Sequence, residues 1–110
     1  MNSATAEIKP WVVPGLKTVD DVVAEIWGID KEKLYVHIKK REIVEARMVA
    51  MQYRNKVLGL SLSLSAYPYS LNHTAVVHAN KTICNLLQSD PAFRIRYGLF
   101  QQAVQSLSPR

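Results

Sequence analysis

The sequence predicts an all-α domain, a bundle of about six helices. Apolar residues recur at helical spacing along most of the chain, and the runs begin at capping residues and end at glycine or before proline. Only one segment alternates as a strand does, and a lone strand has nothing to pair with. Because 48% of the 110 residues are hydrophobic, the chain can build one core. We expect a single helical domain over 18–108.

The N-terminal part combines an arm with a first helix. Pro10 and Pro14 disfavour a helix within 1–17, so this stretch is expected to be an arm, partly extended or disordered. Thr18 is a suitable N-cap for a helix that ends at Gly28. A second, short helix is then expected to begin at Asp30 and to run through Leu34, Val36 and Ile38.

The middle of the chain predicts one long and one short helix. Residues 42–58 follow a 3.6-residue period, with Glu42 near the start and Lys56 near the end, as the helix dipole favours, and Gly59 is a natural stop. Residues 60–65 alternate leucine with serine, which by itself indicates a half-buried strand. Since the chain has no second clear strand, we expect a short helix there.

The last two helices have clear start signals. Asn72 can cap a helix that extends to about Gln88, and Asp90 followed by Pro91 can start another. Pro68 predicts a turn before Asn72. Segments 60–67 and 72–88 together predict a helix-turn-helix.

Charge is unevenly distributed. The chain carries 14 Lys and Arg against 9 Asp and Glu. Residues 33–56 hold seven bases and two acids, including the basic cluster Lys39-Lys40-Arg41, whereas residues 1–32 hold three bases and six acids. This bias favours an anionic partner such as nucleic acid, although a solvated loop would explain the cluster equally well.

Several other functional classes have little support. The only cysteine, Cys84, excludes an internal disulfide and is expected in the core. His73 and His78 are poorly spaced for a shared metal, and no base with an orienting acid stands out. We therefore expect no catalytic residues, metal or cofactor. No apolar segment reaches the roughly 20 residues of a membrane helix, so a cytoplasmic protein, nucleoid-associated if it binds DNA, is expected.

Three blocks of residues, in order along 19–104, resemble the C-terminal DNA-binding domain of the bacterial replication initiator DnaA. They are Val23-Ala24-Glu25-Ile26-Trp27-Gly28-Ile29 with Leu34, then Lys39-Lys40-Arg41 with Ala46-Arg47 and Ala50-Met51, then His73-Thr74-Ala75-Val76-Val77-His78-Ala79. The resemblance implies a Trp repressor-like helical bundle whose helix-turn-helix binds double-stranded DNA.

The resemblance also implies roles for particular residues. The basic cluster is expected on the backbone or in the minor groove, and the helix from Asn72 in the major groove. The full set of candidate DNA contacts is Lys39, Lys40, Arg41, Arg47, Asn72, His73, Thr74, Ala75 and Lys81. Leu71-Asn72 stands where the family has Arg-Asp, Tyr69-Ser70 where it has Gly-Gly, and Ala75 where it has a second Thr, which implies an altered sequence preference.

The expected function is a stand-alone DNA-binding module. No Gly-x-x-x-x-Gly-Lys-Ser/Thr motif occurs, so neither nucleotide binding nor ATPase activity is expected. A regulator of replication or a mobile-element factor would fit, possible partners being replication or mobile-element proteins. The alternative is a helical protein-interaction module that has lost DNA recognition, with Leu71 beside Tyr67 and Tyr69 as an apolar patch.

Overall fold

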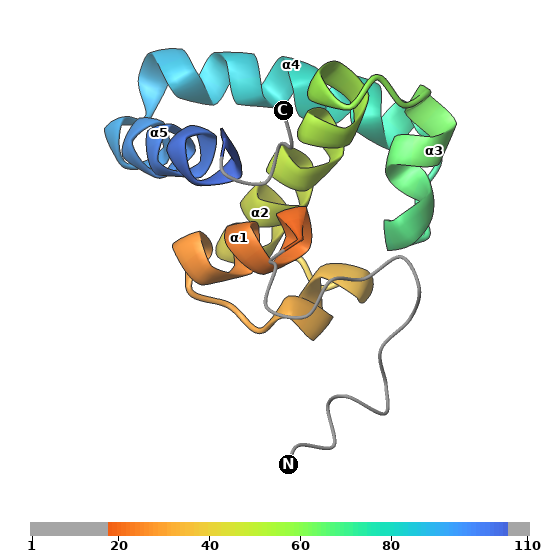
Figure 1. The fold of residues 1–110 in the computed structure, drawn as a ribbon, viewed down its shortest axis with the longest axis horizontal. Helices are drawn as coiled ribbons and strands as arrows, with labels where there is room; N and C mark the ends of the chain where they lie inside the picture. The colour runs from red at the N-terminus through yellow and green to blue at the C-terminus, as the bar shows by residue number, and fades with distance from the viewer. Residues whose placement is uncertain (1–17, 106–110) are drawn as a thin grey trace.

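The computed structural model describes residues 18–105, and these form helices and turns without a strand (Figure 1). The all-α prediction is confirmed. The predicted arm, 1–17, and the end of the predicted domain, 106–108, lie outside the described residues. The α-helices are α1 (Val19–Trp27), α2 (Arg41–Gln52), α3 (Leu62–Ala66), α4 (His73–Ser89) and α5 (Pro91–Gln105). Shorter turns are the 3-10 helices η2 (Lys31–Tyr35) and η4 (Tyr67–Tyr69) and the π-helical turn η3 (Tyr53–Val57).

Helix α1 begins and ends as predicted. The Thr18 hydroxyl accepts from the Asp21 amide at 3.2 Å, and the Asp21 carboxylate accepts from the Thr18 amide at 2.9 Å. This reciprocal capping box satisfies two amides that the helix start leaves unpaired. Gly28 ends the helix in the left-handed region with φ 71°.

The second predicted helix is shorter than expected. It is the 3-10 helix η2, which ends at Tyr35 and does not reach Ile38, and Asp30 gives it no side-chain cap. The backbone becomes extended at Val36, with φ −115° and ψ 155°. At this point the Arg47 side chain donates hydrogen bonds to the carbonyls of Leu34 and Val36, and the Val36 carbonyl also accepts from the Ile38 amide at 2.9 Å.

Helix α2 continues into a wider turn where the sequence predicts a uniform helix to Leu58. The Leu58 amide donates to the Tyr53 carbonyl at 3.1 Å, five residues back, which is the π-helical pattern. Gly59 follows with φ 75° and ends the element, as predicted.

The alternating segment is helical, as predicted, and its serines explain how. The Ser61 hydroxyl caps α3 by accepting from the Leu64 amide at 3.1 Å. Ser65 is fully buried and donates to the Ser61 carbonyl at 2.8 Å. Because both serines bond within the helix, the alternation does not report the two faces of a strand.

The core takes side chains from α1, η2, α2, α4 and α5, and also from η3, α3 and η4 through Tyr53, Ala66 and Tyr69. Its most buried members include Val23, Leu34, Val49, Ile83 and Phe93, each at most 1% exposed. In Figure 1, α4 lies across the α2 helix and packs beside α5. No helix within residues 18–105 is long and apolar enough to cross a membrane.

Candidate nucleic-acid interface

The helix-turn-helix consists of α3, η4 and α4, and Asn72 caps its second helix. The Asn72 Oδ1 atom accepts from the Thr74 amide at 3.0 Å. Two residues before Asn72, Ser70 has φ 57°, in the left-handed region that favours glycine. The predicted cap is confirmed, and it occupies the side-chain oxygen of Asn72.

Helix α4 has distinct inner and outer faces near its start. Val76, Ala79 and Ile83 are fully buried against the core. His73, Thr74, Val77, His78 and Lys81 are exposed on the other side. The periodicity leaves an outer face of small polar, apolar and cationic side chains, which suits the mixed edges of base pairs.

Two further expectations about this helix need adjustment. Ala75 is half-buried and packs against the core, so only part of its methyl group faces outward. Cys84, expected in the core, is exposed, because it lies outside the inward stripe of Val76, Ala79 and Ile83.

The basic loop, residues 36–40, lies beside the turn of the helix-turn-helix. Lys39 and Lys40 are exposed. His37 Nε2 lies 3.3 Å from the Tyr69 carbonyl oxygen, three residues before the Asn72 cap. The structure therefore brings together the basic loop and the segment that leads into α4, which are more than thirty residues apart in sequence.

Arg41, the third member of the basic cluster, is the first residue of α2 and is engaged in ion pairs. Its side chain is 69% exposed, and its Nε donates to Glu45 at 2.9 Å while Nη2 pairs with Asp90. The hydrogen bond that Arg41 donates to Glu45 and the nearby carboxylates raise the pKa of Arg41. Glu45 is itself buried and accepts from the Trp27 indole at 3.0 Å. Arg41 is thus accessible but already paired.

Arg47 is not where the sequence predicted it. We expected a DNA contact, but this residue is only 7% exposed and its guanidinium lies inside the bundle. Nε donates to the Leu34 carbonyl at 2.9 Å and Nη2 to the Val36 carbonyl at 2.6 Å. Burial lowers the pKa of Arg47. The residue holds the backbone of η2 and the start of the basic loop, so the DNA-contact expectation is corrected.

A polar cluster that sequence reasoning missed lies behind the turn. The Asp20 carboxylate accepts from the hydroxyls of Tyr35 and Tyr69 and from Arg54 Nη2, the last at 3.3 Å. Arg54 Nε also donates to the Tyr69 hydroxyl at 3.1 Å. In the sequence these residues look like a helix-start acid, a surface base and turn aromatics, and no spacing rule joins four separate elements.

The electrostatics of this polar cluster are consistent with its burial. Burial raises the pKa of Tyr69, and the negative charge of Asp20 raises it further. Burial opposes ionisation of Arg54, yet Tyr69 and Asp20 outweigh that effect, so the pKa of Arg54 is raised. The cluster is therefore a hydrogen-bonded ion pair with both tyrosines protonated.

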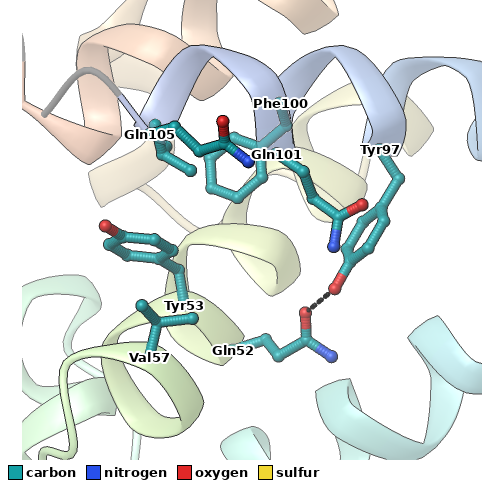
Figure 2. Close-up of a pocket in the computed structure, with 8 residues that line it drawn as sticks. Gln52, Tyr53, Val57, Tyr97, Phe100, Gln101 and Gln105 are labelled. Carbon is teal, nitrogen blue, oxygen red and sulfur yellow. Dashed lines mark hydrogen bonds between the residues drawn. The ribbon is translucent and has the colours of Figure 1, made fainter. Parts of the chain in front are cut away.

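A separate hollow of about 220 Å³ lies between the end of α2, η3 and α5 (Figure 2). Tyr53, Phe100 and Val57 give it a largely apolar lining, and the Tyr97 hydroxyl donates to Gln52 at 2.6 Å at its edge. None of its lining residues comes from the basic loop or from α4, so it is distinct from the candidate interface. Within residues 18–105, no three His, Cys, Asp or Glu side chains are grouped so that they could hold a metal ion.

Comparison with known proteins gives one consistent result. The family described as bacterial dnaA protein helix-turn-helix matches residues 16–83, which include α1 to α3 and α4 as far as Ile83.

Several similar proteins are chromosomal replication initiator proteins DnaA. The protein from Flavobacterium psychrophilum is 31% identical over 77 residues, covering 69% of this chain and 16% of that protein. The one from Symbiobacterium thermophilum is 32% identical over 94 residues, covering 82% and 20%. The one from Bacteroides thetaiotaomicron is 30% identical over 94 residues, covering 82% and 19%. The chain thus spans at most a fifth of these relatives' length, and it belongs to the bacterial DnaA helix-turn-helix family.

Proposed function

We propose that this chain binds double-stranded DNA sequence-specifically, with the start of α4 in the major groove and the basic loop on the backbone or in the minor groove. One observation carries the proposal most directly. The exposed face of α4 and the exposed Lys39 and Lys40 belong to segments that meet at Tyr69, through the 3.3 Å approach of His37. A groove-sized helix end with adjacent cations is the usual arrangement of helix-turn-helix proteins on DNA.

Different side chains serve different parts of the contact. Lys39, Lys40 and Lys81 provide exposed positive charge for phosphates. His73 and Thr74 lie in the first turn of α4, where side chains of this size can reach base edges. Arg47 is not among the contacts, because its donors are bound to backbone carbonyls.

Asn72 gives this chain a different base preference from that of a protein with aspartate at the same position. Its Oδ1 is used in the cap, so the amide nitrogen is the group left to face DNA. An aspartate at this position would instead cap with one oxygen and offer a second acceptor to a base amino group. We infer a target that presents an acceptor at this position, such as guanine or thymine.

The protein-interaction alternative loses one of its supports. It relied on an exposed Leu71, but that side chain is half-buried against the core. Tyr67 remains 78% exposed, and Leu64, one turn earlier, is 57% exposed. The proposed activity is binding alone, since the sequence carries no phosphate-binding loop.

Selection of bound sequences from a random duplex pool tests the proposal. We expect enrichment of one short motif, and affinity for it that falls with salt at roughly 0.9 log unit per phosphate contact for each log unit of salt. A matched selection with Thr74→Ala is expected to enrich a more degenerate motif. Recovery of no motif by the wild-type protein at low salt would contradict sequence-specific binding.

A further inference from the structure

We propose that the Tyr69 hydroxyl is a positioning group for DNA recognition: bound to Asp20 and Arg54, it fixes the start of α4 relative to the basic loop. The inference rests on the proposed function and names residues that do not themselves contact DNA. These residues form the polar cluster of Asp20, Tyr35, Arg54 and Tyr69, and none of them is among the DNA contacts proposed above.

Tyr69 is placed where it can control the recognition helix. It ends η4, and only Ser70 and Leu71 separate it from the Asn72 cap of α4. Its side chain is fully buried. The hydroxyl donates to Asp20 Oδ1 at 2.5 Å and accepts from Arg54 Nε at 3.1 Å, so it is bonded to both α1 and η3. The turn before α4 is therefore attached to two other elements of the bundle.

The basic loop is attached to the same residue. Tyr35, at the end of η2, donates to the same Asp20 carboxylate, and its ring is parallel to the Tyr69 ring with centroids 5.8 Å apart. His37 approaches the Tyr69 carbonyl. Tyr69 thus contacts the segment that carries Lys39 and Lys40 at two points. Its ring packs against the ring of Tyr35, and its backbone carbonyl lies beside His37.

Packing of the ring at position 69 does not by itself require a hydroxyl. A phenylalanine would fill the same apolar space, but it would leave Asp20 Oδ1 and Arg54 Nε without a partner on the turn. Arg54 would still reach Asp20 through Nη2, 3.3 Å from Oδ2, so the ion pair would persist while the turn lost its bond to it. Linked hydrogen bonds in a buried site restrict relative movement of the elements that they join, and contact geometry at a binding site is sensitive to shifts of about 1 Å.

The test compares three tyrosine-to-phenylalanine variants, each lacking one hydroxyl. Tyr69→Phe removes the turn's bond, Tyr35→Phe removes the loop's bond to Asp20, and Tyr97→Phe removes a hydroxyl that bonds Gln52 on the far side of α2. For each, affinity is measured for the selected duplex and for a random duplex, below the unfolding transition, and amide hydrogen exchange is measured in the free protein.

Tyr69→Phe is expected to lower the ratio of specific to random affinity by roughly tenfold, the scale of one well-formed base contact. Amide exchange in residues 70–74 should accelerate. Tyr35→Phe should accelerate exchange in the basic loop and weaken both duplexes alike. Tyr97→Phe, which also removes a partly buried hydrogen bond, should keep the wild-type ratio and the wild-type exchange at both segments.

Two outcomes separate the claims. If Tyr69→Phe keeps the wild-type affinity ratio and wild-type exchange in residues 70–74, the hydroxyl only stabilises the fold, and the positioning proposal is overturned while DNA binding stands. If the wild-type protein shows no preference for any duplex, the proposed function fails first and the positioning proposal fails with it.

Discussion

Two groups of basic side chains differ in burial. The guanidinium groups of Arg47 and Arg54 are buried or half-buried in the bundle, whereas the ammonium groups of Lys39, Lys40 and Lys81 lie at the surface. Arg47 is 7% exposed and bonds backbone carbonyls, and Arg54 is half-buried against Asp20 and Tyr69. The three lysines are exposed. Arginine offers five donors in a fixed plane that can satisfy several interior acceptors, whereas lysine is a strongly hydrated point charge. Arg47 and Arg54 therefore stabilise the fold, whereas the three lysines are accessible to an anionic partner.

Because some of the basic side chains are buried or paired, the number of basic residues overstates the positive charge available at the surface. Seven bases lie within residues 33–56, yet Arg47 and Arg54 point inward and Arg41 is paired with Glu45 and Asp90. The surface available to phosphates is therefore smaller and more localised than the sequence suggests. It includes Lys39 and Lys40 on the basic loop and Lys81 on the outer face of α4, while Lys33 and Lys56 are exposed elsewhere.

The largest expected effect is on stability. Arg47→Met keeps much of the side-chain volume but removes the hydrogen bonds from the guanidinium to the Leu34 and Val36 carbonyls, which should lower the free energy of unfolding by about 3 kcal/mol. Lys39→Met, an exposed control, should change it by less than about 0.5 kcal/mol. Urea unfolding measures both. Equal effects of the two variants would show that the interior role of Arg47 is misassigned.

For DNA affinity, the exposed lysines of the basic loop are expected to matter more than Arg47. Replacing Lys39 and Lys40 together by alanine should flatten the dependence of log affinity on log salt by roughly 1.8, or 0.9 for each lost phosphate contact. The stability of the variant should stay close to that of the wild type. Lys56, exposed at the end of η3, offers a matched control, and Lys56→Ala should retain the wild-type slope. An unchanged slope in the double variant would remove the basic loop from the interface.

Asn72 offers a test of specificity without loss of the helix start. Asn72→Asp preserves the cap on Thr74 and replaces the outward amide donor with an acceptor. The selected motif should change at one position, toward a base with an amino group, with discrimination of about 1–3 kcal/mol. Selection with the variant measures this change. An identical motif would place Asn72 outside the DNA contact.

The pairing of Arg41 provides a smaller test. Asp90→Asn keeps a capping side chain before α5 and weakens the hold on Arg41 Nη2, so the salt dependence should steepen by up to roughly 0.9. Asp30→Asn makes the same charge change at an exposed position in another part of the molecule and serves as the control. If both variants steepen the slope equally, overall charge is responsible and release of Arg41 is not.

The smallest expected effect is a loss of stability in alkali. Burial raises the pKa of Tyr69 above its ordinary value of 10.0, so above that pH the unfolded chain releases a proton that the folded protein retains. The contribution of Tyr69 is fully present below pH 10.0 and is lost as the pH rises further. Tyr69→Phe should show a shallower alkaline loss of unfolding free energy than the wild type. Tyr67→Phe, which removes an exposed hydroxyl, should behave as the wild type does.

Helix starts and stops were predictable because they depend on neighbouring residues. Thr18, Asn72 and Asp90 cap the helices expected of them, and Gly28 and Gly59 end the preceding elements. The outward placement of His73 and Thr74 also follows from local periodicity.

What the sequence did not predict depends on distant partners. Arg47 and Lys39 are equally basic in the sequence, and only the fold places carbonyls of η2 around Arg47. The same holds for Asp20 and Tyr69, which are 49 positions apart and share one hydrogen bond. The hydrogen bonds from Arg47 to the Leu34 and Val36 carbonyls, 13 and 11 positions away in sequence, have the same origin.

The most direct test of the account is to map backbone amide NMR shifts of this 12.4 kDa protein while a selected duplex is added. We predict that the largest changes cluster at Lys39, Lys40, His73, Thr74 and Lys81. Residues of the hollow in Figure 2 should be little affected. Changes centred on α5 or on that hollow, or none at all, would contradict binding through α4 and the basic loop.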